Sequence, residues 1–86
     1  MGYRVKIIVE RKPGVADPEG STITDALKRL GNQSVIKVNV SKLFVLQVEA
    51  VNPSAAKAIA LEIGKTILSN PIIETFSVFT IEEIHV

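Results

Sequence analysis

A chain of 86 residues can enclose one small hydrophobic core, which leaves no room for a separate catalytic domain. Apolar residues make up 47% of it and aromatic residues 5%, so the composition indicates an aliphatic folded core rather than a disordered segment. The net charge of +1 is spread along the chain, and cysteine is absent. No apolar run approaches the roughly 18 residues of a membrane span. We therefore expect one domain over residues 1–86, soluble and cytoplasmic, with neither nucleic acid nor membrane as a partner.

The first predicted strand is Tyr3–Glu10, in which apolar and polar side chains alternate. Lys12, Pro13 and Gly14 end it. Residues 17–22 then offer several side chains that can cap a helix. The apolar residues that follow recur at helical spacing, and they are Ile23, Ala26, Leu27 and Leu30. Gly31 is the expected end of this helix.

The segment Val35–Ala50 is too long for an average strand and too rich in β-branched residues for a helix. A hairpin with a three-residue loop at 41–43 would place Val40 opposite Phe44 and keep the apolar side chains of both arms on one face. Such loops favour glycine, which this segment lacks. A bend or bulge in one long strand is the alternative.

The second predicted helix begins at Asn52 as the N-cap, followed by Pro53 at the first helical position. It should end before Asn70, because the residue that precedes a proline is disfavoured in the helical region. Gly64 within it predicts that another segment of backbone packs closely there. The apolar stripe of this helix comprises Ala56, Ile59, Ala60, Ile63 and Ile67.

The last segment, Glu74–Val86, reads as a strand with apolar residues at both even and odd positions. One buried face cannot account for both sets. Either the strand contains a bulge, or its second face is covered by another chain. Leu43 and Val45, on the outer face of the middle segment, are further candidates for such a contact.

The expected order is therefore strand, helix, strand, strand, helix, strand. It predicts an α+β fold of two layers, with an antiparallel sheet of the split βαβ type that is related to the ferredoxin-like fold. The surplus apolar strand faces predict that the domain dimerises through its strands.

A catalytic site would need a nucleophile with a base, convergent carboxylates or a metal cluster. The single histidine, His85, lies beside Glu82 and Glu83, and these three read as the solvated end of an edge strand. Asp17 and Asp25 fit helix capping and the helix dipole better than acid–base chemistry. We therefore expect no catalytic, cofactor-binding or metal-binding residue in this chain.

Two stretches resemble the PurS family, the small subunit of phosphoribosylformylglycinamidine synthase. The first is residues 15–20, Val-Ala-Asp-Pro-Glu-Gly, with the apolar helix positions after it. The second is residues 68–74, Leu-Ser-Asn-Pro-Ile-Ile-Glu, and the resemblance covers essentially the whole chain. The chain departs from the family at residues 39–42, where an Arg-x-Gly-Lys run is usual and only Lys42 matches. It departs again at residues 75–76, where the family has Asp-Tyr.

The resemblance implies a non-catalytic subunit of an ATP- and glutamine-dependent ligase complex in purine biosynthesis. Such a subunit is a homodimer or tetramer that bridges a synthetase (PurL-type) and a glutaminase (PurQ-type) and helps shape the ammonia path between them. ATP and magnesium would be used by the synthetase, with no cofactor on this chain. The alternative is an ACT-like module that senses a small molecule.

The residues expected at interfaces fall into two groups. Three polar residues are expected to face the partner subunits, and they are Lys12, Asp17 and Lys42. Four apolar residues of the last strand are expected to face a second copy, and they are Phe76, Val78, Phe79 and Ile81.

Overall fold

The computed structural model describes residues 1–85, and within that range it contains three strands, two α-helices and one π-helical turn. In chain order these are β1 (Gly2–Arg11), α1 (Pro18–Arg29), β2 (Lys42–Glu49), α2 (Pro53–Ile63), the π-helical turn η1 (Gly64–Leu68) and β3 (Glu74–Ile84). The strands form one antiparallel sheet in the order β2-β1-β3. The expected α+β class with an antiparallel sheet is confirmed. The predicted extension of the last strand to Val86 lies outside the described residues.

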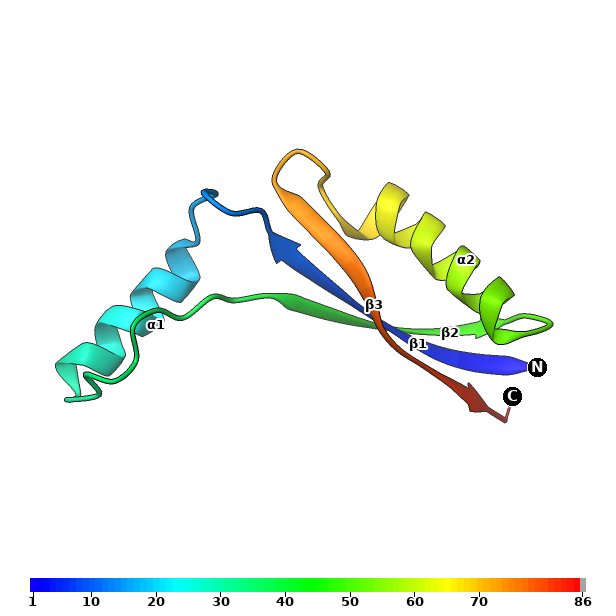
Figure 1. Ribbon diagram of the computed structural model, residues 1–86, viewed down its shortest axis with the longest axis horizontal. Helices are drawn as coiled ribbons and strands as arrows, with labels where there is room; N and C mark the ends of the chain where they lie inside the picture. Colours follow the sequence, from blue (N-terminus) through cyan, green and yellow to red (C-terminus); the bar gives the residue numbers. More distant parts are fainter. Residues whose placement is uncertain (86) are drawn as a thin grey trace.

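The core lies between β1 and α2, which runs along one face of the sheet (Figure 1). The alternation in β1 places Tyr3, Val5, Ile7 and Val9 on this face, where each is at most 3% exposed. Ala56 and Ala60 of α2 are fully buried against them. Because these helix side chains are so small, the axis of α2 can lie close to the central strand.

A bulge in β3 accounts for the apolar residues at both even and odd positions. Val78 pairs with Ile7 and Thr80 with Lys6, so Phe79 is the extra residue between them. The bulge therefore returns Ile81 to the face that already carries Phe76 and Val78. The bulged-strand alternative is confirmed, and Phe79 itself is 60% exposed.

The predicted hairpin in residues 35–50 is wrong. Lys42 and Leu43, expected in its loop, are the first residues of β2, and the preceding segment 35–41 runs into β2 without turning back (Figure 1). Positive φ angles occur, among the described residues, only at Gly14 and Gly31, so this segment adopts no left-handed turn. The long-strand alternative is nearer to the structure, although only the part from Lys42 onward is paired within the sheet.

Residues 35–41 instead lie along α1. Together, α1 and residues 35–41 form an arm that extends away from the sheet (Figure 1). The backbone N–H of Val38 donates to the Thr24 hydroxyl oxygen at 2.9 Å. A Cβ at Gly20 would collide with the carbonyl oxygen of Val38, so glycine permits this contact. The arm makes the molecule long and flat, with extents of 51 × 28 × 14 Å.

The predicted helix ends agree with the structure. Asp17 and Asn52 are the N-caps of α1 and α2, and each is followed by a proline. Gly31, with φ of 92°, follows the end of α1. Gly64 does allow a close approach, but the neighbour is the ring of Phe76 and not the backbone that was expected; its Cδ2 would lie 2.7 Å from a Cβ on that glycine.

Candidate partner-binding site

Asp17 lies where the arm joins the sheet, and its carboxylate holds together three parts of the chain. Oδ1 accepts from the backbone N–H of Gly20 at 2.9 Å and from Nη1 of Arg11 at 3.0 Å. Oδ2 accepts from the backbone N–H of Val40 at 2.8 Å. The side chain of Asp17 is only 10% exposed. One carboxylate thus links the end of β1, the start of α1 and the segment that enters β2.

These contacts hold the pKa of Asp17 at about 2, below its ordinary 3.8. The N–H of Val40 contributes most, the N–H of Gly20 next, and burial opposes both by raising the pKa. Arg11 lowers it further through its hydrogen bond and its charge. Asp17 is consequently an anion at every pH near neutrality.

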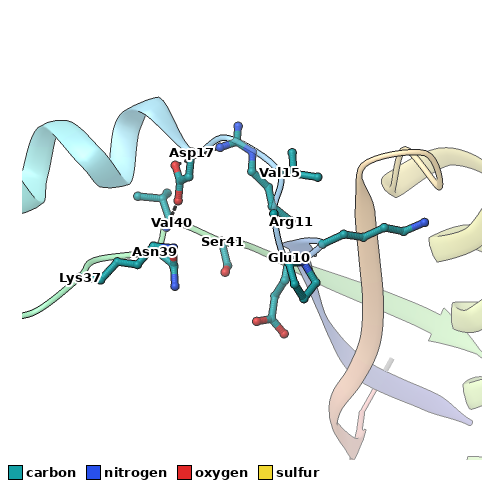
Figure 2. A pocket seen from close by; sticks show the side chains of 11 residues that line it. Glu10, Arg11, Val15, Asp17, Lys37, Asn39, Val40 and Ser41 are labelled. Atoms are coloured by element: carbon teal, nitrogen blue, oxygen red, sulfur yellow. Dashed lines mark hydrogen bonds and ion pairs between the residues drawn. The ribbon is translucent and has the colours of Figure 1, made fainter.

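A cleft of about 340 Å³ opens beside this carboxylate, between the end of β1 and the entry to β2 (Figure 2). Cationic side chains line it from both sides, Arg11 and Lys12 from the end of β1 and Lys37 from the arm. Asn39 and Ser41 of the same arm segment also line it, as does the carboxylate of Glu10 (Figure 2). Within residues 1–85, neither lysine forms an ion pair, so both charges are available to a carboxylate on another molecule.

The three polar interface candidates are brought together. Lys12 and Asp17 line the cleft, and the backbone N–H of Lys12 donates to the carbonyl oxygen of Ile73, which fixes the loop to the start of β3. Lys42 lines a smaller adjoining hollow that shares Arg11 with the cleft. Their contact with partner subunits stays a prediction.

The four apolar candidates are divided between the two faces of the sheet. Phe76, Val78 and Ile81 are half-buried on the α2 side and pack against the core. Phe79 is exposed and so are Leu43 and Val45, which are 53% and 52% exposed. That any of the four contacts a second copy stays a prediction.

Sequence reasoning missed two cationic residues of the cleft, Arg11 and Lys37. Arg11 ends β1 and gives no local signal of its ion pair with Asp17, six residues later. Lys37 reaches the cleft only because the arm segment continues straight into β2. A hairpin at residues 41–43 would have placed it elsewhere.

The residues that line this cleft include one side-chain hydroxyl. Its hydroxyl group, on Ser41, has no base hydrogen-bonded to it, and the part of the chain that the structure describes holds no group of three His, Asp or Glu side chains that could bind a metal. Glu82, near His85, is instead paired with Arg4 at 2.7 Å. The charged side chains that line the cleft can recognise a charged surface on another molecule.

Neither described α-helix is long and apolar enough to cross a membrane.

Comparisons with known proteins identify the family. A family model, PurS, described as phosphoribosylformylglycinamidine (FGAM) synthase, matches residues 4–83. The FGAM synthase subunit PurS of Archaeoglobus fulgidus is 38% identical over 72 residues, covering 84% of this chain and 90% of that subunit.

Solved structures of PurS proteins have a fold similar to that of this chain. Thermus thermophilus PurS matches with a TM-score of 0.89 at 29% identity, covering 99% of this chain and 100% of that one. A chain in the structure of PurLQS from Thermotoga maritima matches with a TM-score of 0.83 at 28% identity, covering 98% of this chain and 99% of that one. The chain thus belongs to the PurS family and is a subunit of FGAM synthase, a ligase complex.

Proposed function

We propose that this chain is the non-catalytic assembly subunit of its FGAM synthase and bridges the synthetase and glutaminase subunits. The observation that carries the proposal is the match, over nearly the whole of both chains, to a chain in the PurLQS structure of Thermotoga maritima. The buried residues form one core between the sheet and α2, which supports a single PurS-type domain over 1–86. We propose that this domain works in the cytoplasm.

In this proposal, the two larger subunits carry out the catalysis. The glutaminase releases ammonia from glutamine, and the synthetase uses ATP and magnesium to transfer it to formylglycinamide ribonucleotide. The small subunit binds no cofactor and holds the two larger subunits in an orientation that shapes the ammonia path.

The cleft beside Asp17 is the proposed contact with a larger subunit. Lys12 lines this cleft and Lys42 lines the adjoining hollow, while Asp17 holds the backbone of Gly20 and Val40 beside them. Two of the positions at which this chain departs from the family run, Asn39 and Ser41, lie in the same cleft. We therefore expect this chain to bind the larger subunits of its own organism more tightly than those of other organisms.

The apolar strand residues are the proposed contacts in a homodimer. Phe79 has the greatest exposure of the four, while Phe76, Val78 and Ile81 reach a second copy only through the parts that the core leaves uncovered. The alternative, an ACT-like sensing module, would instead require a small ligand to bind the isolated chain.

Reconstitution tests the proposal. Glutamine-dependent amidine synthesis is measured with the matching synthetase and glutaminase, with and without this chain, while light scattering follows the mass of the mixture. We expect the chain to restore both activity and a larger assembly. Active partners whose mass and rate are unchanged by the chain would overturn the proposal.

A charge-reversal variant tests the cleft in the same assay. K12E/K42E should weaken assembly and lower the rate, and saturating concentrations of the chain should recover the rate. The matched control is Lys57→Glu on α2, an exposed lysine outside the cleft. Equal effects of the two variants would exclude the cleft as the contact.

A further inference from the structure

The loop between η1 and β3 ends in an apolar tip that stays exposed in the described chain. The tip consists of Pro71, Ile72 and Ile73, and all three residues are exposed. Ile72 is 81% exposed and lies outside the set of side chains that pack against the core. A single exposed isoleucine is common on soluble proteins, so exposure alone indicates no function. The backbone beneath Ile72 is what distinguishes this loop.

Hydrogen bonds with Asn70 hold the backbone of the loop in one conformation. Oδ1 of Asn70 accepts from the N–H of Ile72 at 3.1 Å, which is the bond of an Asx turn. The carbonyl oxygen of Asn70 accepts from the N–H groups of Ile73 at 3.1 Å and Glu74 at 2.7 Å. In return, the N–H of Asn70 donates to the Glu74 carboxylate at 2.7 Å. Because Pro71 lacks an N–H, every backbone N–H from Asn70 to Glu74 has an acceptor within the loop.

A backbone held in this way can present Ile72 to another protein at little entropic cost. Ordering a mobile loop at an interface costs free energy, and a loop that is ordered before it binds avoids that cost. Transfer of the isoleucine side chain from water into an apolar pocket is itself favourable. The tip thus has the two properties of an anchoring side chain in a protein–protein contact, which are a fixed position and an apolar surface.

The loop is bonded to the end of β1, beside the cleft that we assign to a larger subunit. The N–H of Lys12 donates to the carbonyl oxygen of Ile73 at 2.8 Å, and Lys12 also lines the cleft. Glu74, which follows the tip, lines the adjoining hollow together with Lys42. The loop and the end of β1 lie at the same end of the sheet (Figure 1). A protein surface that occupies the cleft therefore passes close to the tip.

We propose that Ile72 inserts into an apolar pocket of the same larger subunit that occupies the cleft. The proposal rests on the proposed function, and it adds an apolar contact to the charged one. The rim of this pocket is expected to carry a carboxylate. Lys12 is bonded to the tip through its backbone, and within residues 1–85 its side chain forms no ion pair, so its charge is available to that carboxylate.

The cleft beside Asp17 and its adjoining hollow do not fit the tip of a second copy of this chain. Charged side chains line both, among them Arg11. Insertion of Ile72 there would take these charges out of water without pairing them, which is unfavourable. A contact between the tips of two copies would bury far less than the roughly 800 Å² per partner of a stable interface. A larger subunit of the ligase complex is therefore the partner that the tip fits.

Replacement of Ile72 by serine tests the contact, with Val51→Ser as the matched control. Val51 is also 81% exposed, and it follows β2 at the opposite end of the sheet. Each variant is titrated into the synthetase and glutaminase together, and amidine synthesis gives the concentration for half-maximal rate. Ile72→Ser should raise this concentration about tenfold, as expected when an anchoring side chain is truncated, and leave the rate at saturation unchanged. Val51→Ser should behave as the wild type does. Equal effects of the two variants would overturn the proposal.

Asn70→Ala tests the ordered backbone while Ile72 is kept. This variant removes the acceptor of the Ile72 N–H, so hydrogen exchange at that amide should accelerate. The concentration for half-maximal rate should rise about threefold, because the loop must then be ordered on binding. Asn70→Asp keeps an acceptor oxygen at the same place and should restore both measurements towards the wild type. Faster exchange in Asn70→Ala with unchanged binding would exclude the ordered backbone as part of the contact.

Photochemical cross-linking identifies the partner, because the natural chain contains no cysteine. Ile72→Cys and Ser41→Cys are each labelled with benzophenone maleimide and assembled with both larger subunits. Ser41 lines the cleft, and Val51→Cys is the control. The labels at residues 72 and 41 should attach to the same larger subunit. Attachment of the two labels to different subunits would overturn the proposal.

Self-association of the chain alone, measured by sedimentation, should be the same for Ile72→Ser and the wild type. A weaker homodimer would overturn the proposal, because the tip would then contact a second copy. If the wild type restores synthesis and Ile72→Ser needs no higher concentration, the tip contact is wrong and the assembly role stands. A wild-type chain that neither binds the larger subunits nor restores synthesis would overturn both.

Discussion

The backbone N–H of Val40 donates to Oδ2 of Asp17 across 2.8 Å, and this bond joins the end of the arm to its beginning. Arg11 binds the other carboxylate oxygen. The direction of the arm relative to the sheet therefore depends on one side chain.

Replacement of Asp17 by asparagine should loosen the arm and spare the sheet. The amide retains one acceptor oxygen, so either Gly20 or Val40 loses its partner, and Arg11 loses its ion pair. Hydrogen exchange should accelerate at the Val40 amide, while exchange at Val5 in the central strand should stay slow. Asp25→Asn, an exposed carboxylate on the same helix, is the control. Unchanged exchange at Val40 would contradict the assigned role.

The stability of the arm should fall in acid over a defined range. The pKa of Asp17 is about 2 in the folded chain and 3.8 ordinarily, so its contribution is fully present above pH 3.8 and is lost as the pH falls through 2. The chemical shift of the Val40 amide, followed by NMR from pH 5 to about pH 1.5, should titrate with a midpoint near 2. The same transition should be absent in Asp17→Asn.

Gly64→Ala should destabilise the domain although it favours the helix. Alanine gains about 1 kcal/mol over glycine in a helix interior. The added Cβ would lie 2.7 Å from Cδ2 of Phe76, and overpacking of this kind costs about 1–3 kcal/mol. Urea unfolding should show a net loss of up to about 2 kcal/mol.

A second substitution checks that the loss arises at the ring. Phe76→Leu should be less harmful in the Gly64→Ala background than in the wild type, because the smaller side chain relieves the contact. Lys65→Ala is the neighbouring control. Strict additivity of the two changes would mean that the glycine and the ring do not interact.

Deletion of Phe79 should be tolerated better than deletion of Ser77. Without Phe79, Val78 still pairs with Ile7 and Thr80 with Lys6, so the free energy of unfolding should change by less than about 1 kcal/mol. Without Ser77, the start of β3 slips by one residue and Phe76 moves to the open face, at a cost of about 2 kcal/mol. Circular dichroism during urea titration measures both. Equal losses would place the bulge elsewhere.

Several features of the fold could be predicted because local chemistry decides them. The alternation in β1 identified its buried face, and Asp17 and Asn52 were recognisable caps. Gly64 signalled a close contact because glycine inside a helix is otherwise unfavourable. The two motifs that resemble PurS supplied the family.

The course of residues 35–41 could not be predicted, because the alternation of apolar side chains is the same whether this segment folds back as a hairpin or continues straight into β2. Its direction depends on Thr24 and Asp17, which accept the N–H groups that a hairpin would have used. The residues of the cleft could be predicted only in part, for the same reason. Lys12, Asp17 and Lys42 were identified, while Arg11 and Lys37 join them only through the folded path of the arm.

The central position of β1 also determines the order in which the domain can form during synthesis. The first strand made is the one that both others must join, and its Gly2 pairs with Glu49 on one side and Ile84 on the other. Because such distant pairings form slowly, the apolar residues of β1 stay exposed until β2 and α2 are made, and one edge of β1 stays unpaired until β3 is made. A truncated or stalled chain should therefore be a target for chaperones, and completion of the last strand is the step that ends this exposure.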